Sequence, residues 1–337
     1  MLGGFFAFLS AALFGLNNAA TRRGVLNGTV IQGMAITVPM GAALFLVVCL
    51  ATGTLAPLWT FSPRALVCFS CAGLAHFVIG RYCNYRAIAA IGTNLASPIQ
   101  QWEVLVTLAL AMAFLGERLT PITVIAIALL LMGPAVAARI EAQRAANAPA
   151  PGAAAPKADD AASLKFEPRY REGYTWAFLS IFGYGISPIF VRAGLDGAGI
   201  GASMAAGLAS YIAATIAVII WVLASRNVAH VRALRADPRR WFLFAGMLVG
   251  LSQMARYMAL ALVPVTIVAP IMRIQSLFRI YFSWILTRDY EVFDRHVIVG
   301  TVISVAGAIL ITLPPEMVAG WLPLPGWAKS VLTWRWP

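Results

Sequence analysis

The chain has 337 residues, of which 61% are hydrophobic and 11% are charged. Ordinary soluble domains carry about one-quarter charged residues, so this composition, with a mean hydropathy of +0.81, excludes a soluble globular enzyme. The 25 Lys and Arg residues outnumber the 13 Asp and Glu residues and give a formal net charge of +12. A basic chain can bind nucleic acid. Cytoplasmic loops of membrane proteins also collect Lys and Arg. The positions of the basic residues along the chain must therefore distinguish nucleic-acid binding from membrane topology.

Ten apolar stretches are long enough to cross a bilayer, which takes about 20 residues as a helix. The predicted spans are residues 3–21, 30–51, 65–86, 94–115, 120–139, 174–192, 202–225, 241–262, 266–287 and 296–313. The runs are continuously apolar, whereas the strands of a membrane barrel alternate in polarity. The sequence therefore predicts an all-α membrane protein. The first span is expected to be retained, because Arg22 and Arg23 follow it instead of preceding it as in a signal peptide.

A segment without a possible core divides the spans into two sets of five. Residues 141–172 consist largely of Ala, Pro and mixed charges, and such a composition buries too little apolar surface to fold alone. We expect a flexible linker there, between a first unit at 1–140 and a second at 173–314. The remaining tail, 315–337, is expected to lie at the membrane interface, where Trp is enriched, or else to be disordered. Its tryptophans are Trp321, Trp327, Trp334 and Trp336.

The two units resemble each other at a nearly constant offset. Ala7-Phe8-Leu9-Ser10 recurs as Ala177-Phe178-Leu179-Ser180, and Arg22 recurs as Arg192. Farther along the chain the offset changes from 170 to 172, which aligns Tyr85 with Tyr257 and Pro98 with Pro270. Each unit has an odd number of spans, so the second enters the membrane from the opposite side. The sequence therefore predicts ten transmembrane helices as two inverted five-helix repeats, an arrangement that places a site near the midplane for alternating access.

Three short motifs resemble those of the EamA-like family of the drug/metabolite transporter superfamily. They are Phe14-Gly15-Leu16-Asn17-Asn18, Ala96-Ser97-Pro98-Ile99 and Phe114-Leu115-Gly116-Glu117-Arg118-Leu119. The resemblance covers both units but neither the linker nor the tail, and the second unit departs from it at Leu286-Thr287-Arg288-Asp289, where the family has a Gly-Glu pair. It implies a ten-helix secondary carrier without covalent cofactors. Many such carriers export amino acids, small metabolites or drugs.

The basic residues are distributed unevenly between the two sides of the predicted membrane. Five lie on the side of the N-terminus and sixteen on the other side. The positive-inside rule then places the linker 141–172 in the cytoplasm and both termini outside. The resemblance implies the opposite orientation, and we favour the charge count. The expected location is a bacterial inner membrane.

Five ionisable side chains fall inside the spans, where a charge is costly and marks a functional-site hypothesis. They are Arg81, Glu103, Arg256, Arg273 and Arg279. The alternatives are structural ion pairs between helices, or arginines that extend to the interface. At the 172 offset each pairing joins a charge to a neutral hydrogen-bonding group: Arg81 with Gln253, Asn84 with Arg256, Gln101 with Arg273, and Glu103 with Gln275. This pattern predicts a pseudo-symmetric polar cavity.

Helical spacing adds Tyr85 to the face of Arg81 and Asn84, and Tyr257 to that of Gln253 and Arg256. Four arginines against one carboxylate make the predicted cavity cationic, and the Arg fork suits a carboxylate or phosphate. We therefore expect a small-molecule substrate with an anionic group, such as an amino acid or organic acid. The candidate substrate-binding residues are Asn17, Arg81, Asn84, Tyr85, Gln101, Glu103, Gln253, Arg256, Tyr257, Arg273, Gln275 and Arg279.

Further roles are assigned to a few of these positions and their neighbours. Glu103 either neutralises an arginine, the interpretation we favour, or binds a proton that drives transport. His76 is a weaker candidate for a proton relay. Pro98 and Pro270 are expected to kink the fourth helix of each unit and to act as hinges.

The sequence has no metal-ligand cluster, phosphate loop or nucleotide-binding domain, so we expect no metal and no cofactor. The leading hypothesis is a secondary transporter, not an enzyme, whose partners are the lipid bilayer and a small molecule and not nucleic acid. Cys68 and Cys71 form a Cys-x-x-Cys pair, which leaves a membrane thiol redox enzyme as one alternative. A non-transporting sensor that uses the linker and the tail is another. Oligomeric state is left open.

Overall fold

The computed structural model describes residues 2–116, 120–132, 167–195, 197–291, 293, 295–312, 315–321 and 323–334. Most of the predicted linker and the Glu117-Arg118-Leu119 motif lie outside these residues. The described chain is built of helices joined by short turns, without a strand in these ranges. The helices of the first unit are α1 (Leu2–Asn27), α2 (Val30–Thr52), α3 (Pro57–Thr60), α4 (Pro63–Gly73), the π-helix η1 (Leu74–Gly80), α5 (Arg81–Gln100), α6 (Glu103–Leu115) and the helix Pro121–Met132. Those that follow are α8 (Tyr170–Leu195), α9 (Ile200–Ala224), α10 (Val228–Arg232), α11 (Ala236–Leu262), α12 (Val265–Met272), α13 (Gln275–Thr287), the 3-10 helix η2 (Arg288–Tyr290), α14 (Arg295–Thr312), α15 (Pro315–Trp321) and α16 (Gly326–Thr333).

Six helices of the described chain are long and apolar enough to cross a membrane. They are Leu2–Asn27, Val30–Thr52, Pro63–Ser97, Tyr170–Leu195, Ile200–Ala224 and Ala236–Leu262. Shorter apolar helices cover Glu103–Phe114, Pro121–Met132 and Ile298–Gly307. The all-α prediction is confirmed. The count of ten spans stays a prediction, because the fourth and ninth predicted spans are interrupted here and the fifth extends beyond the described residues.

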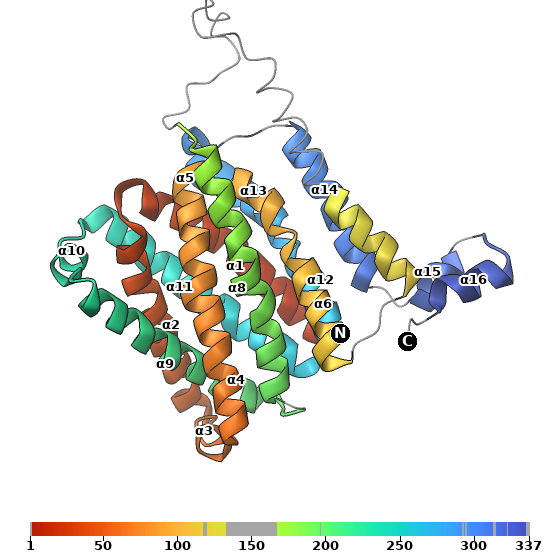
Figure 1. The fold of residues 1–337 in the computed structure, drawn as a ribbon, viewed down its shortest axis with the longest axis horizontal. Helices are drawn as coiled ribbons and strands as arrows, with labels where there is room; N and C mark the ends of the chain where they lie inside the picture. Colours follow the sequence, from red (N-terminus) through yellow and green to blue (C-terminus); the bar gives the residue numbers. More distant parts are fainter. Residues whose placement is uncertain are drawn as a thin grey trace, which may run out of the picture.

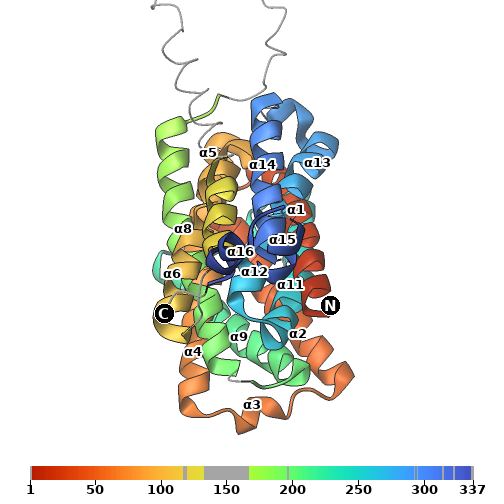
Figure 2. The ribbon, with the colours of Figure 1, turned by 90° about the vertical axis from the view of Figure 1, so that its right-hand side faces the viewer.

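The long helices pack side by side in one bundle, with α14 at its edge and α15 and α16 beyond α14 (Figure 1). In the two perpendicular views, α3 lies at the end of the bundle opposite to the connection between α13 and α14 (Figures 1 and 2). The first helix of each unit packs on the other unit. Helix α1 lies against α11 and α13, and α8 lies against α5 and α6. The two units are therefore joined into one bundle by exchanged contacts.

Two glycines at equivalent positions permit these exchanged contacts. A Cβ atom on Gly15 of α1 would lie 2.5 Å from the Cβ of Phe278 on α13. A Cβ atom on Gly185 of α8 would lie 3.0 Å from the Cβ of Val106 on α6. Small residues let helix backbones approach closely in membranes. The two glycines are 170 residues apart in the sequence, and Val106 and Phe278, the residues that they contact, are 172 apart. These are the two offsets of the sequence repeat.

Local signals fix the ends of several helices. Thr29 and Gln32 form a capping box at the start of α2, and Gly53 ends that helix in the left-handed conformation. Ser62 caps α4 by accepting a hydrogen bond from the backbone N–H of Ala65. Gly92, at φ 82°, makes the turn between the third and fourth predicted spans. Glycine adopts this conformation without the steric penalty that a Cβ atom incurs.

A buried ion pair closes the bundle around the Gly92 turn. Glu291 accepts hydrogen bonds from the backbone N–H groups of Thr93 and Asn94, at 2.7 and 3.0 Å, and from the Thr93 hydroxyl. Arg22 lies 3.7 Å from the same carboxylate and donates to the carbonyl of Ile88 at 2.7 Å. Glu291 thus caps the helix that begins after the turn, and Arg22 caps the helix that ends before it. This cluster of residues is called the Arg22–Glu291 cap below.

The fourth helix of each unit is interrupted at the same place. Helices α5 and α6 are separated by Gln101 and Trp102, and α12 and α13 are separated by Arg273 and Ile274. The backbone N–H of Trp102 bonds to the carbonyl three residues earlier, and so does that of Ile274, at 3.1 and 3.0 Å. The breaks begin three residues after Pro98 and Pro270. A hinge role for these prolines stays a prediction.

The third helix of the first unit contains the π-helix η1 between α4 and α5. π-Helical turns are rare and often occur at functional sites. On one side of η1, the backbone of Gly73 lies so close to α9 that a Cβ atom there would meet the carbonyl of Ser210 at 2.0 Å. On the other, Gly80 lies against Gly183 of α8. The wide turn therefore lies where three helices approach closely.

The tail contains two short helices, α15 and α16, and carries exposed tryptophans. Trp321, Trp327 and Trp334 are 65%, 74% and 57% exposed. Trp336 lies outside the described residues. That the tail lies at the membrane interface stays a prediction.

Candidate functional site

A polar cavity lies in the middle of the bundle and is lined by both units. The volume open to the centre of a water molecule is about 30 Å³. One water needs roughly 10–15 Å³ on this measure, so the cavity has room for two or three waters in this conformation. It is lined by Phe14, His76, Gln100, Glu103, Tyr184, Pro188, Gln253, Arg256, Leu260, Val268, Ala269, Met272, Arg273, Gln275 and Arg279.

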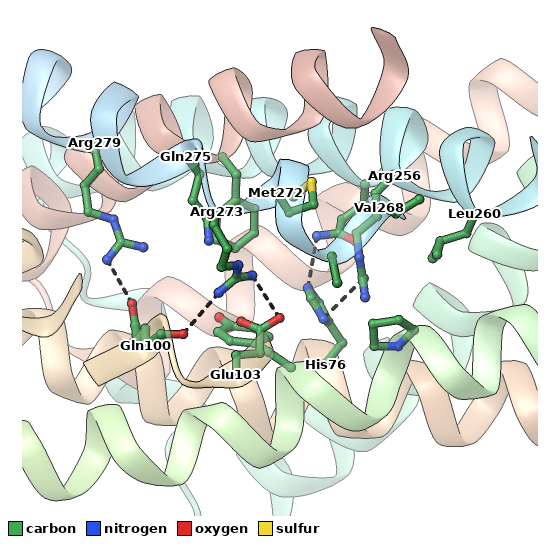
Figure 3. A pocket seen from close by; sticks show the side chains of 15 residues that line it. His76, Gln100, Glu103, Arg256, Leu260, Val268, Met272, Arg273, Gln275 and Arg279 are labelled. Carbon is green, nitrogen blue, oxygen red and sulfur yellow. Dashed lines mark hydrogen bonds and ion pairs between the residues drawn. The ribbon is translucent and has the colours of Figure 1, made fainter. Parts of the chain in front are cut away.

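An ion pair between the two helix breaks forms one wall of the cavity (Figure 3). Nη2 of Arg273 lies 3.0 Å from Oε1 of Glu103, and both side chains are largely buried. Glu103 is the first residue of α6, where the positive end of the helix dipole favours a carboxylate. Nη1 of Arg273 donates to the carbonyl of Gln100 at 3.0 Å, at the end of the preceding half-helix. Each break thus supplies one member of the pair.

Gln100 joins several polar groups beside this ion pair. Its Oε1 accepts a hydrogen bond from Arg279 at 2.8 Å, and its Nε2 donates to Asn84 at 2.7 Å and to Ser180 at 3.2 Å. Arg279 also donates to the carbonyl of Thr93 at 3.3 Å. Arg279 is therefore held by neutral oxygens.

His76 and Arg256 lie on the other side of the cavity (Figure 3), and Gln253 joins them in a second cluster. Nη1 of Arg256 donates to Oε1 of Gln253 at 3.0 Å and lies 3.3 Å from Nδ1 of His76. Nε2 of Gln253 lies 3.0 Å from Nε2 of His76. The imidazole projects from η1, and the other two side chains project from α11. We call these three residues the His76 cluster.

The charges around the cavity do not balance. Of the residues that line it, Arg256, Arg273 and Arg279 are cationic and Glu103 is the one carboxylate. Glu103 is paired with Arg273. Within the described part of the chain, neither Arg256 nor Arg279 has a carboxylate within ion-pair distance. A buried charge without a counter-charge costs several kcal/mol.

The structure brings half of the predicted substrate-binding residues to the cavity. Those that line it are Glu103, Gln253, Arg256, Arg273, Gln275 and Arg279. Those that are not among its lining residues are Asn17, Arg81, Asn84, Tyr85, Gln101 and Tyr257. Contact between any of them and a substrate stays a prediction.

The other six residues are buried, and all but Asn17 contact a neighbouring helix or helix break. Arg81 donates to Tyr211 on α9 at 3.1 Å, and Tyr85 donates to Thr37 on α2 at 3.2 Å. Asn84 bonds to Asn18 on α1 as well as to Gln100. Gln101 donates to Ser276. Asn17 accepts a weak bond from Thr21, and Tyr257 packs against Phe45.

Sequence reasoning assigned no substrate-binding role to Gln100 and Tyr184. Gln100 precedes the helix break, and Tyr184 packs its ring 4.6 Å from that of His76. The equivalent of Gln100 at the 172 offset, Met272, also lines the cavity, but an apolar residue there gave no signal in the sequence. His76, a minor candidate, lies at the centre of the second cluster.

The two cysteines of the redox hypothesis are not among the residues that line the cavity. Cys68 and Cys71 are half-buried free thiols and do not line it. In the part of the chain that the structure describes, no three His, Cys, Asp or Glu side chains are grouped as metal ligands.

Comparison with known proteins agrees with this architecture. One solved structure, titled "Crystal structure of protein", is 15% identical, with a TM-score of 0.60 over 92% of this chain and 98% of its own. At this identity the likeness shows a shared fold. No curated protein matches the sequence. The model of the EamA-like transporter family matches residues 1–139 and 171–313. The chain is a multi-pass membrane protein, and it belongs to the EamA-like transporter family, whose members are transporters of the drug/metabolite superfamily.

Proposed function

We propose that this protein is a secondary transporter for a small metabolite with an anionic group, and that it exports this metabolite by alternating access. The observation that carries the substrate class is Arg256, a buried cation in the cavity wall whose described partners are the neutral groups of His76 and Gln253. A carboxylate or phosphate on the substrate would supply the missing charge, since the Arg fork matches both. An amino acid or organic acid fits this description.

Alternating access is supported by the equivalent helix breaks. Discontinuous helices at a repeat interface surround the substrate in many carriers, and here Gln101 and Arg273 occupy the two breaks. A cavity with room for two or three waters cannot hold a metabolite without rearrangement. The ion pair between Glu103 and Arg273 joins the two breaks, so its geometry would change as one unit moves against the other.

The direction and location of transport come from other arguments. Export is common among the carriers that the sequence resembles. The excess of Lys and Arg on the linker side favours a cytoplasmic linker and an inner-membrane location. A fusion reporter at the linker tests the orientation, and a periplasmic linker would refute it.

The test of function compares the metabolites that accumulate outside and inside cells with and without the chain. The expected result is a carboxylate- or phosphate-bearing compound that leaves cells expressing the wild-type protein and is retained by cells expressing Arg256→Gln. Arg240→Gln is the matched control, because Arg240 is exposed and pairs with an exposed Asp237. Equal export by the wild type and Arg256→Gln, at equal membrane levels, would refute an anion site at Arg256.

A further inference from the structure

The hydrogen bonds of the His76 cluster cannot all form at once. Arginine has only donors, and the amide nitrogen of glutamine is also a donor. Gln253 is oriented by Arg256, which donates to its Oε1, so its amide nitrogen points to Nε2 of His76. Arg256 itself points to Nδ1. Both ring nitrogens therefore face donors.

A neutral imidazole has one N–H group and one acceptor nitrogen. In either tautomer, one ring N–H must then point at a donor. A protonated ring is less stable here than a neutral ring, because both of its N–H groups would face donors and its charge would lie beside that of Arg256. His76 is 5% exposed, so bulk water does not remove the conflict. Among its own side chains, the cluster lacks one acceptor.

An anionic group bound at Arg256 supplies this acceptor and changes the preferred state of His76. When Arg256 turns to the anion, Nδ1–H of His76 can donate to the same anion. Gln253, released from Arg256, can rotate its amide so that Oε1 accepts from Nε2–H. The protonated imidazole is then satisfied at both nitrogens, and the anion offsets its charge.

The other charged or titratable groups near His76 do not provide an alternative acceptor. Arg81, at the start of α5, adds a second nearby positive charge. Tyr184 of α8 packs its ring against the imidazole at an interplanar angle of 53°. Glu103, across the cavity, is paired with Arg273 at 3.0 Å. The anion that favours protonation of His76 must therefore come from outside the cluster.

We infer that His76 is the proton-coupling residue of this carrier and binds one proton together with the anionic group of the substrate. The inference rests on the proposed anionic substrate. It transfers the coupling role from Glu103 to His76 and leaves Glu103 as the counter-charge of Arg273. Since proton and anion bind together, they cross the membrane in the same direction, and a monocarboxylate leaves as its undissociated acid.

The test uses formate, the smallest carboxylate, on the full chain in lipid nanodiscs. Histidine is labelled with ¹⁵N, and ring shifts follow the protonation of each histidine between pH 5 and 8.5. Saturating formate is expected to raise the pH midpoint of His76 by about one unit, which is about a tenfold gain in proton affinity. Because coupling is reciprocal, formate affinity, measured by line broadening of ¹³C-formate, rises by the same factor at low pH. His230, which bonds to Thr29 and is exposed, is the internal control.

Two variants separate the possible outcomes. The inference is supported if formate raises the His76 midpoint in the wild type and if the broadening of formate is lost in Arg256→Gln. His76→Gln is then expected to bind formate independently of pH. If formate binding depends on Arg256 but the His76 midpoint does not move, the coupling role is overturned and the proposed anion site stands. If formate binding is absent or persists in Arg256→Gln, both the coupling role and the anion site are overturned.

Discussion

Glu291→Gln is the sharpest test of how this bundle is held together. Glu291 is 2% exposed and lies in the Arg22–Glu291 cap, where its two oxygens accept three hydrogen bonds from Thr93 and Asn94. Glutamine keeps one acceptor oxygen but places an NH₂ group where the second oxygen accepts the Asn94 N–H. It also removes the charge opposite Arg22, whose side chain is 1% exposed.

The expected cost follows from these contacts. Breaking a buried ion pair by removing one charge costs about 3–5 kcal/mol. The amide oxygen that remains keeps both hydrogen bonds from Thr93, at about 1 kcal/mol each, so we expect a net loss of about 1–3 kcal/mol. Asp237→Asn is the control, because the Asp237–Arg240 pair is largely exposed, and such pairs contribute about 0–1 kcal/mol.

The assay is reversible unfolding by a denaturing detergent in mixed micelles, followed by circular dichroism. The midpoint of Glu291→Gln is expected well below those of the wild type and Asp237→Asn, which should nearly coincide. A Glu291→Gln protein within about 0.5 kcal/mol of the wild type would refute the reasoning, because such a value is typical of surface substitutions away from buried networks.

Three further predictions concern packing, the thiols and the ion pair. Gly73→Ala places a Cβ atom 2.0 Å from a backbone carbonyl of α9 and is expected to destabilise by about 1–3 kcal/mol, measured by the same unfolding assay. Gly199→Ala, with open space around it, is its control, and equal losses in the two would contradict the packing argument. Cys68→Ser with Cys71→Ser is expected to leave export unchanged; loss of export with normal insertion would favour the thiol redox hypothesis. Glu103→Gln leaves its arginine partner without a counter-charge and is expected to abolish export at normal membrane levels, so wild-type export rates would argue against the cavity.

Hydrophobic run length was sufficient to predict the helical class, whereas the arrangement of the two units as inverted repeats stays a prediction. The offset of 172 also aligns Gln101 with Arg273, and the structure places both at helix breaks. A kink of the fourth helix of each unit was predicted at Pro98 and Pro270, but a two-residue break was not, because an apolar run of 22 residues looks the same whether the helix is continuous or interrupted. Pro98 and Pro270 were the local signals, and each lies three residues before its break.

The face of each helix that meets the cavity could not be predicted from spacing alone. Arg81 and Tyr85 share a helical face, as expected, but that face points to Thr37 and Tyr211 instead of the cavity. Periodicity fixes which residues lie together on a helix, whereas the rotation of the helix depends on its neighbours. His76 was only a minor candidate for the same reason. Its position in the cavity wall depends on contacts with Gln253 and Arg256 of α11, which the spacing of residues on its own helix does not reveal.

The π-helix Leu74–Gly80 makes the two units of the proposed alternation unequal. At the 172 offset, the matching residues of the second unit belong to α11, which continues without interruption from Ala236 to Leu262. Closing the wide turn by deleting one residue would rotate α4 by about 100° relative to α5, which is one residue of an α-helix. In the proposed alternation, the cavity opens first to one side of the membrane and then to the other. The side chains that line the two openings are therefore not equivalent. We therefore expect the proposed alternation to be asymmetric, with different substrate affinities at the two faces of the carrier even in the absence of a gradient.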